Sequence, residues 1–186
     1  MSNVESLLKS KLCDVDVAGL KAIKKEYFEL LIDNPFSKAP TSGNFYEMIN
    51  YFKRKDETNP ICIGPYKNIT PFEAANRIAS DLVIINGLLQ LERNNPNLKE
   101  ASFILRLGTT HKKEKGDITI KIGNNEFEGE AFNVAPSFLK TKLNKTLKKW
   151  KKNDKLRYIL INKDAFEEIH FNSLDERVVK VEKWHE

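Results

Sequence analysis

The sequence predicts an α/β (α+β) fold in which a mixed central sheet is flanked by helices. Three observations predict it: a strongly capped helix over 70–94, three strand-like segments in succession between 101 and 134, and a helix over 136–152 that leads into a strand over 156–162. With 186 residues, the chain is long enough to bury a substantial core, and we expect a single domain.

The first 69 residues predict a helical extension to this core. Apolar side chains recur at helical spacing over 20–31, and Asp14 or Asp16 is the candidate N-cap of that helix. A second helix with apolar positions on one side is expected over 45–52.

The helix over 70–94 has the clearest start signals in the chain. Thr70 is a candidate N-cap, Pro71 fits the first helical position, and Glu73 stands where a capping box needs an acid. The preceding segment, 59–68, holds two prolines and a glycine and is expected to be a loop. The second half of the helix is apolar nearly all round, so we expect it to be buried against a sheet.

Three polar positions of this helix, Glu73, Arg77 and Asp81, form one stripe at i, i+4 and i+8. The simpler interpretation is a ladder of ion pairs on the surface. The alternative is that Glu73 or Asp81 overlooks an acidic cleft, which makes Glu73 a candidate additional acid.

Three segments after Pro96 have the alternation of β-strands: 101–108, 117–122 and 126–134. The turn residues Gly123-Asn124-Asn125 join the last two into a hairpin. Successive side chains of a strand point to opposite faces, so the apolar positions of the first two segments are expected to share one face. In the third segment, the face that carries the glutamates becomes apolar at Phe132, which suggests a covered sheet that opens into a cleft.

Acidic side chains are concentrated on the last two of these strands. Asp117 opens the second strand, and Glu128 and Glu130 project from one face of the third. Like charges at neighbouring same-face positions repel, so a metal ion or a lysine should offset them. Mg²⁺ binds oxygen ligands and commonly takes one or two carboxylates. We therefore expect a metal site suited to phosphodiester chemistry, with an ordinary salt-bridged surface as the alternative.

The segment that follows predicts a crossover back to the sheet. Pro136 starts a helix, and its apolar stripe should pack on the sheet before the nearly continuous apolar strand 156–162. This order implies that 126–134 and 156–162 are parallel. The tail, 177–184, is expected to add an edge strand or to pack across the core. The apolar stripe of the helix that starts at Pro136 consists of Leu139, Leu143, Leu147 and Trp150.

The excess positive charge of the chain lies in one segment. Residues 138–157 hold eight lysines, one arginine and one aspartate, a local charge of +8 in a chain whose total is +5. Such a basic face is typical of a protein that binds a polyanion such as DNA, and a lysine-rich solvated helix is the alternative. The lysines on the polar side of the helix are Lys140, Lys142, Lys145, Lys148, Lys149 and Lys152.

The order of helix, three strands, helix and strand over 70–162, with its acids, resembles the PD-(D/E)xK nuclease superfamily, in particular its restriction-endonuclease-like branch. Gly116-Asp117 matches the Pro-Asp element, with glycine in place of proline, and Glu128 matches the second metal-binding acid. Glu130 occupies the lysine position, as in the Glu-x-Glu variant of the family. The resemblance implies metal binding by Asp117 and Glu128. Either Glu130 acts as a general base, or Lys121, Lys140 or Lys142 takes the place of the family's lysine.

The resemblance also implies a function. It predicts a Mg²⁺-dependent endonuclease of the type II restriction kind, with Mn²⁺ as a substitute, which cleaves double-stranded DNA as a homodimer. The alternative is a non-catalytic module on the same fold that binds nucleic acid or inhibits a protein partner.

Several other classes of protein are not indicated. The two cysteines, Cys13 and Cys62, lack the spacing of a disulfide framework or a zinc site. The first residues lack the apolar segment of a signal peptide, and the longest apolar stretch, 82–89, is too short to span a membrane. We expect a cytoplasmic protein with no membrane partner.

Overall fold

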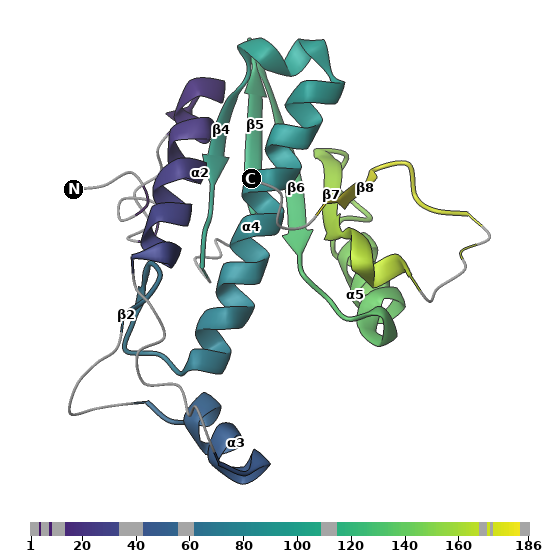
Figure 1. Cartoon of the computed structure of the whole chain (residues 1–186). Helices are drawn as coiled ribbons and strands as arrows, with labels where there is room; N and C mark the ends of the chain where they lie inside the picture. Colours follow the sequence, from purple (N-terminus) through teal and green to yellow (C-terminus); the bar gives the residue numbers. More distant parts are fainter. Residues whose placement is uncertain are drawn as a thin grey trace.

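The computed structural model describes residues 4, 8, 14–33, 43–55, 62–108, 115–167, 171 and 173–182. In this part of the chain, six strands form one sheet and two short strands form a separate hairpin (Figure 1). The order across the sheet is β1-β4-β5-β6-β7-β8. The strands are β1 (Asp14–Val15), β4 (Ser102–Leu105), β5 (Ile118–Ile122), β6 (Asn125–Phe132), β7 (Leu156–Asn162) and β8 (Val178–Val181), and the hairpin is β2 (Cys62–Ile63) with β3 (Tyr66–Lys67).

Four α-helices accompany the strands among the described residues. They are α2 (Val17–Ile32), α3 (Phe45–Lys53), α4 (Pro71–Asn94) and α5 (Pro136–Lys149), and short 3₁₀ helices cover Pro96–Glu100 and Lys163–Phe166. The side chain of Asp16 caps α2 by accepting from the Gly19 amide at 2.7 Å, and Thr70 caps α4 by accepting from the Glu73 amide at 3.1 Å. The four helices therefore begin close to where the sequence predicts them.

The sheet is mixed, as the sequence predicts. Strand β5 is antiparallel to both of its neighbours, β4 and β6, whereas β6 pairs with β7, and β7 with β8, in parallel. The β5–β6 turn has a positive φ of 56° at Gly123, its first central residue, as a type II′ hairpin turn does. The predicted crossover through α5 is confirmed, and of the two alternatives for the tail the structure shows the edge strand, β8.

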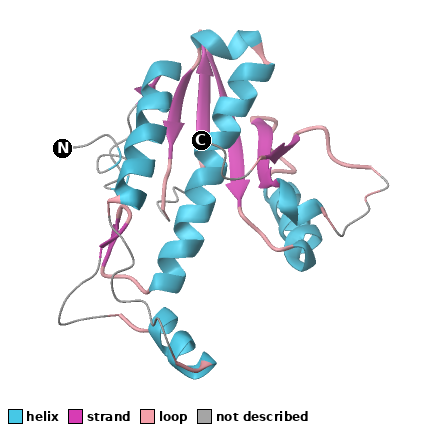
Figure 2. Ribbon diagram, viewed as in Figure 1, coloured by secondary structure: helices cyan, strands magenta, loops and turns pink. Residues whose placement is uncertain are grey.

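Helices α4 and α5 pack on opposite faces of this sheet. Alternate side chains of β7 separate the two cores, because Leu160 packs in the cluster that contains α4, whereas Ile159 and Ile161 pack in the cluster that contains α5. At Gly87, helix α4 approaches the sheet so closely that an added Cβ would lie 2.6 Å from the Leu160 side chain. Figure 2 shows the long α4 helix lying across the sheet.

The N-terminal part of the chain belongs to the main core. Strand β1 pairs with β4 at one edge of the sheet, and α2 buries Leu20, Ile23 and Tyr27 in the cluster that contains α4. The expected helical extension therefore also supplies a strand, which the sequence did not predict, because two residues are too few for an alternating pattern.

The expectation of a loop over 59–68 is wrong in part. Residues 62–67 form the β2–β3 hairpin, with Ile63 and Tyr66 buried and Gly64 at a positive φ of 55° in the turn. The strands are again only two residues long, so the proline and glycine content of the segment concealed them. In the part of the chain that is described, no helix has both the length and the apolar character to cross a membrane.

Candidate active site

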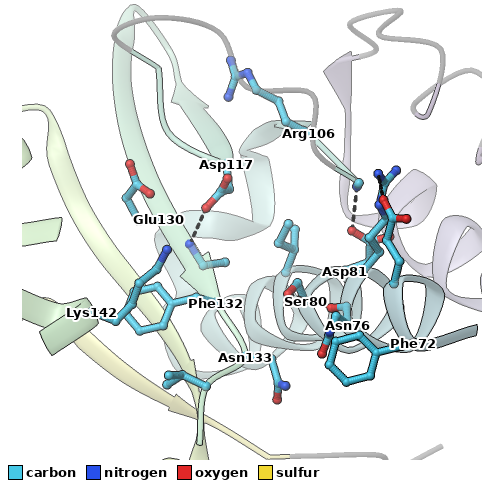
Figure 3. A pocket seen from close by; sticks show the side chains of 16 residues that line it. Phe72, Asn76, Ser80, Asp81, Arg106, Asp117, Glu130, Phe132, Asn133 and Lys142 are labelled. Atoms are coloured by element: carbon cyan, nitrogen blue, oxygen red, sulfur yellow. Dashed lines mark hydrogen bonds and ion pairs between the residues drawn. The ribbon is translucent and has the colours of Figure 1, made fainter. Parts of the chain in front are cut away.

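A cavity of about 540 Å³ opens at one end of the central sheet, and we call it the sheet-end pocket (Figure 3). Its walls come from the first half of α4, from the residues after β4 and before β5, from the end of β6, and from α5. It is lined by Phe72, Glu73, Asn76, Arg77, Ser80, Asp81, Ile84, Arg106, Gly108, Asp117, Glu130, Ala131, Phe132, Asn133, Val134 and Lys142. Four carboxylates and three cationic side chains thus share one cavity.

Asp117 lies in the wall of the pocket, directly before β5. Its carboxylate accepts a hydrogen bond from the Ala131 amide at 2.9 Å, and its backbone carbonyl accepts from the Arg106 amide at 2.9 Å. Because Ala131 directly follows Glu130, the first bond brings the Asp117 carboxylate next to the part of β6 that carries Glu130. The antiparallel pairing of Ile118 with Gly129 places Asp117 and Glu130 opposite each other at the end of the β5–β6 ladder.

Glu130 also lines the pocket, and the end of α5 holds its side chain. One carboxylate oxygen, Oε1, accepts from Trp150 Nε1 at 2.7 Å and from Lys149 Nζ at 2.5 Å. Trp150 is buried, as the sequence predicts, and its indole N–H provides a polar contact beyond its place in the core. Glu130 is therefore oriented by a fixed donor and partly neutralised by a lysine.

Glu128 has a different environment from its neighbour Glu130. Its side chain is 1% exposed, and it is not among the described residues that line the sheet-end pocket. Its carboxylate accepts from the Gly116 amide at 2.9 Å, from Lys115 Nζ at 3.0 Å and from Thr119 Oγ1 at 3.1 Å. The predicted metal pair of Asp117 and Glu128 is thus not brought into one cavity, because internal donors hold Glu128 at the start of β5.

Arg106 completes the buried network around Glu128. Its guanidinium donates to the Gly116 carbonyl at 3.0 Å and to Thr119 Oγ1 at 2.8 Å, and it lies 3.8 Å from the Glu128 carboxylate. Gly116 fits this site because an added Cβ would lie 2.2 Å from the carbonyl oxygen of Gly129. Arg106 was not among the predicted site residues, although a single arginine inside the apolar segment 101–108 is a signal that the sequence carries.

The polar stripe of α4 divides into two parts. Glu73 and Arg77 form the expected ion pair, at 2.5 Å. The ladder interpretation is wrong for Asp81, which is 1% exposed and accepts hydrogen bonds from Tyr27 at 2.7 Å, from the Gly108 amide at 2.8 Å and from Tyr66. Glu73 and Asp81 both line the pocket, so the alternative of acids that overlook a cleft describes the stripe better.

Burial shifts the pKa values of Asp81 and of the two tyrosines that donate to it, Tyr27 and Tyr66. Desolvation raises the pKa of Asp81 to about 6, although the hydrogen bonds from Tyr66, Gly108 and Tyr27 oppose that rise. Burial and the adjacent Asp81 charge also raise the pKa of Tyr27 and of Tyr66 far above the usual range of a phenol. Both tyrosines therefore stay protonated and donate to Asp81.

The candidate lysines are distributed over different parts of the molecule. Lys121 pairs with Asp14 at 2.6 Å, and it lies four residues along β5 from Asp117, which corresponds to roughly 13 Å. Lys142 lines the sheet-end pocket, and its ammonium lies 5.5 Å from the centroid of the Phe132 ring. Lys142 is therefore the candidate that the structure places beside Asp117 and Glu130.

The remaining lysines of α5 form a solvated surface. Lys140, Lys145, Lys148 and Lys149 are exposed, and so is Lys152, which lies three residues beyond the end of the helix. Their helix buries Leu139 and Leu143 on the opposite side, as the predicted stripe requires.

Within the described residues, no group of three or more His, Cys, Asp or Glu side chains is arranged to hold a metal ion. Comparisons with family models, with curated proteins and with solved structures gave no match to this chain. The case for a function therefore depends on the geometry of the sheet-end pocket and on the sequence pattern.

Proposed function

We propose that this protein is a Mg²⁺-dependent endonuclease that hydrolyses phosphodiester bonds of DNA, in the manner of a type II restriction enzyme. The observation that supports the proposal most directly is the meeting of Asp117 and Glu130, from adjacent strands, with Lys142 in one pocket. The chain also follows the helix, three strands, helix and strand order of restriction-endonuclease-like cores.

The carboxylates of the pocket fit a hard divalent cation. Mg²⁺ usually takes one or two carboxylates and completes its coordination with water and substrate phosphate, so Asp117 and Glu130 form a sufficient protein ligand set. Among the described residues, Glu130 receives its hydrogen bonds at Oε1, and none is found at Oε2. We therefore assign the metal to Asp117 and Glu130, and we assign Glu128 the role of holding β5 against β6. When bound, the cation would stabilise negative charge on the phosphate and favour ionisation of water.

The surrounding residues of the chain would orient these ligands. The Ala131 amide fixes the carboxylate of Asp117, and the Trp150 indole fixes that of Glu130. Lys149 compensates the charge of Glu130, and Lys142 supplies a positive charge on the pocket wall, where it would stabilise charge that develops on a phosphate. In this proposal, Lys142 replaces the lysine of the PD-(D/E)xK motif.

The exposed lysines of α5 supply a surface for the DNA backbone. They lie on the helix that also contributes Lys142 to the pocket, so a duplex on this face would run towards the carboxylates. A homodimer, with one pocket for each strand, would suit cleavage of a palindromic site.

A non-catalytic module on the same fold is the second candidate. It is favoured by the engagement of Glu128 with internal donors and by the ion pair between Glu130 and Lys149. In that case the pocket would bind an anionic or nucleic-acid partner without hydrolysis.

A plasmid-cleavage assay separates the two candidates and is our first prediction. Wild-type protein should nick and linearise supercoiled plasmid in Mg²⁺ or Mn²⁺ and should be inactive in EDTA. Asp117→Asn and Glu130→Gln should each lower the rate by about 100-fold or more, because each removes a group that stabilises charge in the reaction.

The matched control is Glu126→Gln, which changes a carboxylate on the same strand that pairs with Lys115 outside the pocket lining. This variant should retain the wild-type rate. Cleavage that is lost equally in all three variants, or that persists in Asp117→Asn, would contradict the assignment. DNA binding without cleavage under any metal condition would favour the non-catalytic module.

A further inference from the structure

An aromatic ring stands at the rim of the sheet-end pocket, on α4. Phe72 lines the pocket and keeps 48% of its surface exposed. The ammonium of Lys53, from α3, lies 4.1 Å from the centroid of this ring. Because this ammonium lies over one face of the ring, a nucleobase would stack on the other face. An aromatic ring with a neighbouring cation is the combination that proteins use to bind single-stranded nucleic acid.

Amide side chains lie close to the ring within the same cavity. Asn76 is one helical turn from Phe72 on α4, and Asn133 follows the end of β6. In Figure 3, Phe72 and Asn76 lie on one side of the pocket, and Asp117 and Glu130 lie on the other. No hydrogen bond joins the side-chain amide of Asn76 or Asn133 to another described residue, so both have donors and acceptors for the edge of a base.

The size of the cavity suits a single nucleotide. A volume of about 540 Å³ lies within the range of pockets that enclose small molecules. From one side of the cavity to the other, the lining provides the Phe72 ring, then the side-chain amides, and then the carboxylates with Lys142. These groups match the base, the base edge and the phosphate of one nucleotide.

We infer that Phe72, with Asn76 and Asn133, forms a binding site for one unpaired nucleobase adjacent to the scissile phosphate. A base inside a duplex has both faces covered by its neighbours, so only an unpaired or extruded base can stack on Phe72. The substrate class is therefore DNA in which one nucleotide at the cleavage site is extruded from the duplex on binding or is already unpaired, as in a bulge. This inference rests on the proposed function, because it assigns the phosphate to Asp117, Glu130 and Lys142.

The test uses binding without cleavage and is our second prediction. The probes are a 20-base-pair duplex and the same duplex with one bulged 2-aminopurine, and both are titrated with full-length protein in EDTA and in Ca²⁺. Wild-type protein should bind the bulged probe more tightly by about 5-fold to 100-fold, the range that stacking of one base provides. The 2-aminopurine fluorescence should be quenched on binding.

Variants at Phe72 test whether its ring causes the preference for the bulged probe and the quenching of 2-aminopurine. Phe72→Leu should bind both probes equally and should not quench the fluorescence, whereas Phe72→Trp should keep the preference and the quenching. Phe45→Leu is the matched control, because Phe45 is 76% exposed but lies outside the pocket lining, and this variant should behave as wild type.

The outcomes separate this inference from the function on which it rests. If wild type and Phe72→Leu bind the bulged probe with the same preference, or if wild type shows no preference while it still binds and cleaves DNA, the base site is overturned and the endonuclease stands. If wild-type protein binds neither probe, the proposed function fails and the base site fails with it.

Discussion

Asp81 joins four separate segments of the chain through one buried carboxylate. Tyr27 reaches it from α2, Tyr66 from the β2–β3 hairpin and the Gly108 amide from the residues after β4, while Asp81 itself belongs to α4. Three donors satisfy the carboxylate, yet its burial still raises its pKa to about 6. A residue in such a position should couple the stability of the fold to pH.

The third prediction concerns this coupling. In the unfolded chain the pKa of Asp81 returns to about 4, so between pH 4 and pH 6 the folded protein binds the proton that the unfolded chain releases. Protonation of Asp81 therefore contributes stability below pH 4, and that contribution is lost as pH rises to 6, by about 3 kcal/mol. Asp81→Asn removes the titrating group.

Urea unfolding at intervals from pH 4 to pH 7 checks this prediction. The free energy of unfolding of wild type minus that of Asp81→Asn should fall across pH 4–6 and should then stay constant. All other carboxylates titrate in both proteins, so they cancel in the difference. Two parallel pH profiles would mean that Asp81 does not change its protonation in this range.

Individual side chains also show where prediction from sequence ends. The sequence correctly predicts Glu128 and Glu130 on one strand and Asp117 at the start of its neighbour, where the structure has it directly before β5. It did not separate the environments of the two glutamates, because that difference arises from donors elsewhere in the chain, Gly116 for one and Trp150 for the other. Hydrogen-bond partners that are distant in sequence leave no local periodic signal.

At the scale of elements, α5 has two faces with different roles. Its apolar side closes the second core over β6 and β7, and its polar side presents exposed lysines to solvent. A positive surface of this kind binds DNA by displacing counterions from phosphates, so its contribution depends on salt.

The fourth prediction tests this surface. Replacing Lys148, Lys145 and Lys152 with glutamine should weaken binding to duplex DNA and should reduce the slope of log K against log salt by about 0.9 for each phosphate that is no longer neutralised. Circular dichroism should be unchanged, because these lysines are exposed and lie away from Leu139 and Leu143. The measurement is fluorescence anisotropy between 50 and 200 mM salt.

A charge-matched triple variant controls for net charge. Lys21, Lys25 and Lys99 are exposed lysines on other elements, and their replacement by glutamine should leave the slope as in wild type. An equal loss of affinity in both triple variants would show that the total charge, and not the face of α5, determines binding.

Helices and long strands were predicted well because their signals are local. Capping residues and apolar periodicity placed the starts of α2 and α4, and alternation placed β5 and β6. The two-residue strands β1, β2 and β3 were not predicted, because their existence depends on pairing with partners and not on a pattern of their own.

At the scale of the whole molecule, the described part of the N-terminal segment packs with the core over 70–162. Helix α2 shares its buried residues with the cluster of α4, while α5 and Trp150 lie in the second cluster, on the other face of the sheet. The sheet joins the two clusters, since alternate residues of β7 belong to each. The single domain expected over residues 1–186 remains a prediction.

The fifth prediction tests whether the two faces of the sheet unfold together. Leu20 is fully buried on α2, and Leu20→Ala should lower the free energy of unfolding by about 2–5 kcal/mol because it leaves a cavity. If the molecule unfolds as one cooperative unit, the fluorescence of Trp150 on the opposite face should report the same loss as circular dichroism does. A Trp184→Phe background leaves Trp150 as the single tryptophan, because the chain has two.

The matched control is Lys25→Ala, which changes an exposed position on the same helix and should alter stability by less than about 0.5 kcal/mol. In Leu20→Ala, both probes should give one shared urea midpoint below that of the background protein. A Trp150 midpoint that does not move while the helical signal shifts would show that the N-terminal segment unfolds on its own. In that case residues 1–69 would be a separate extension on an independent core, and the shared packing of α2 and α4 would contribute little to cooperativity.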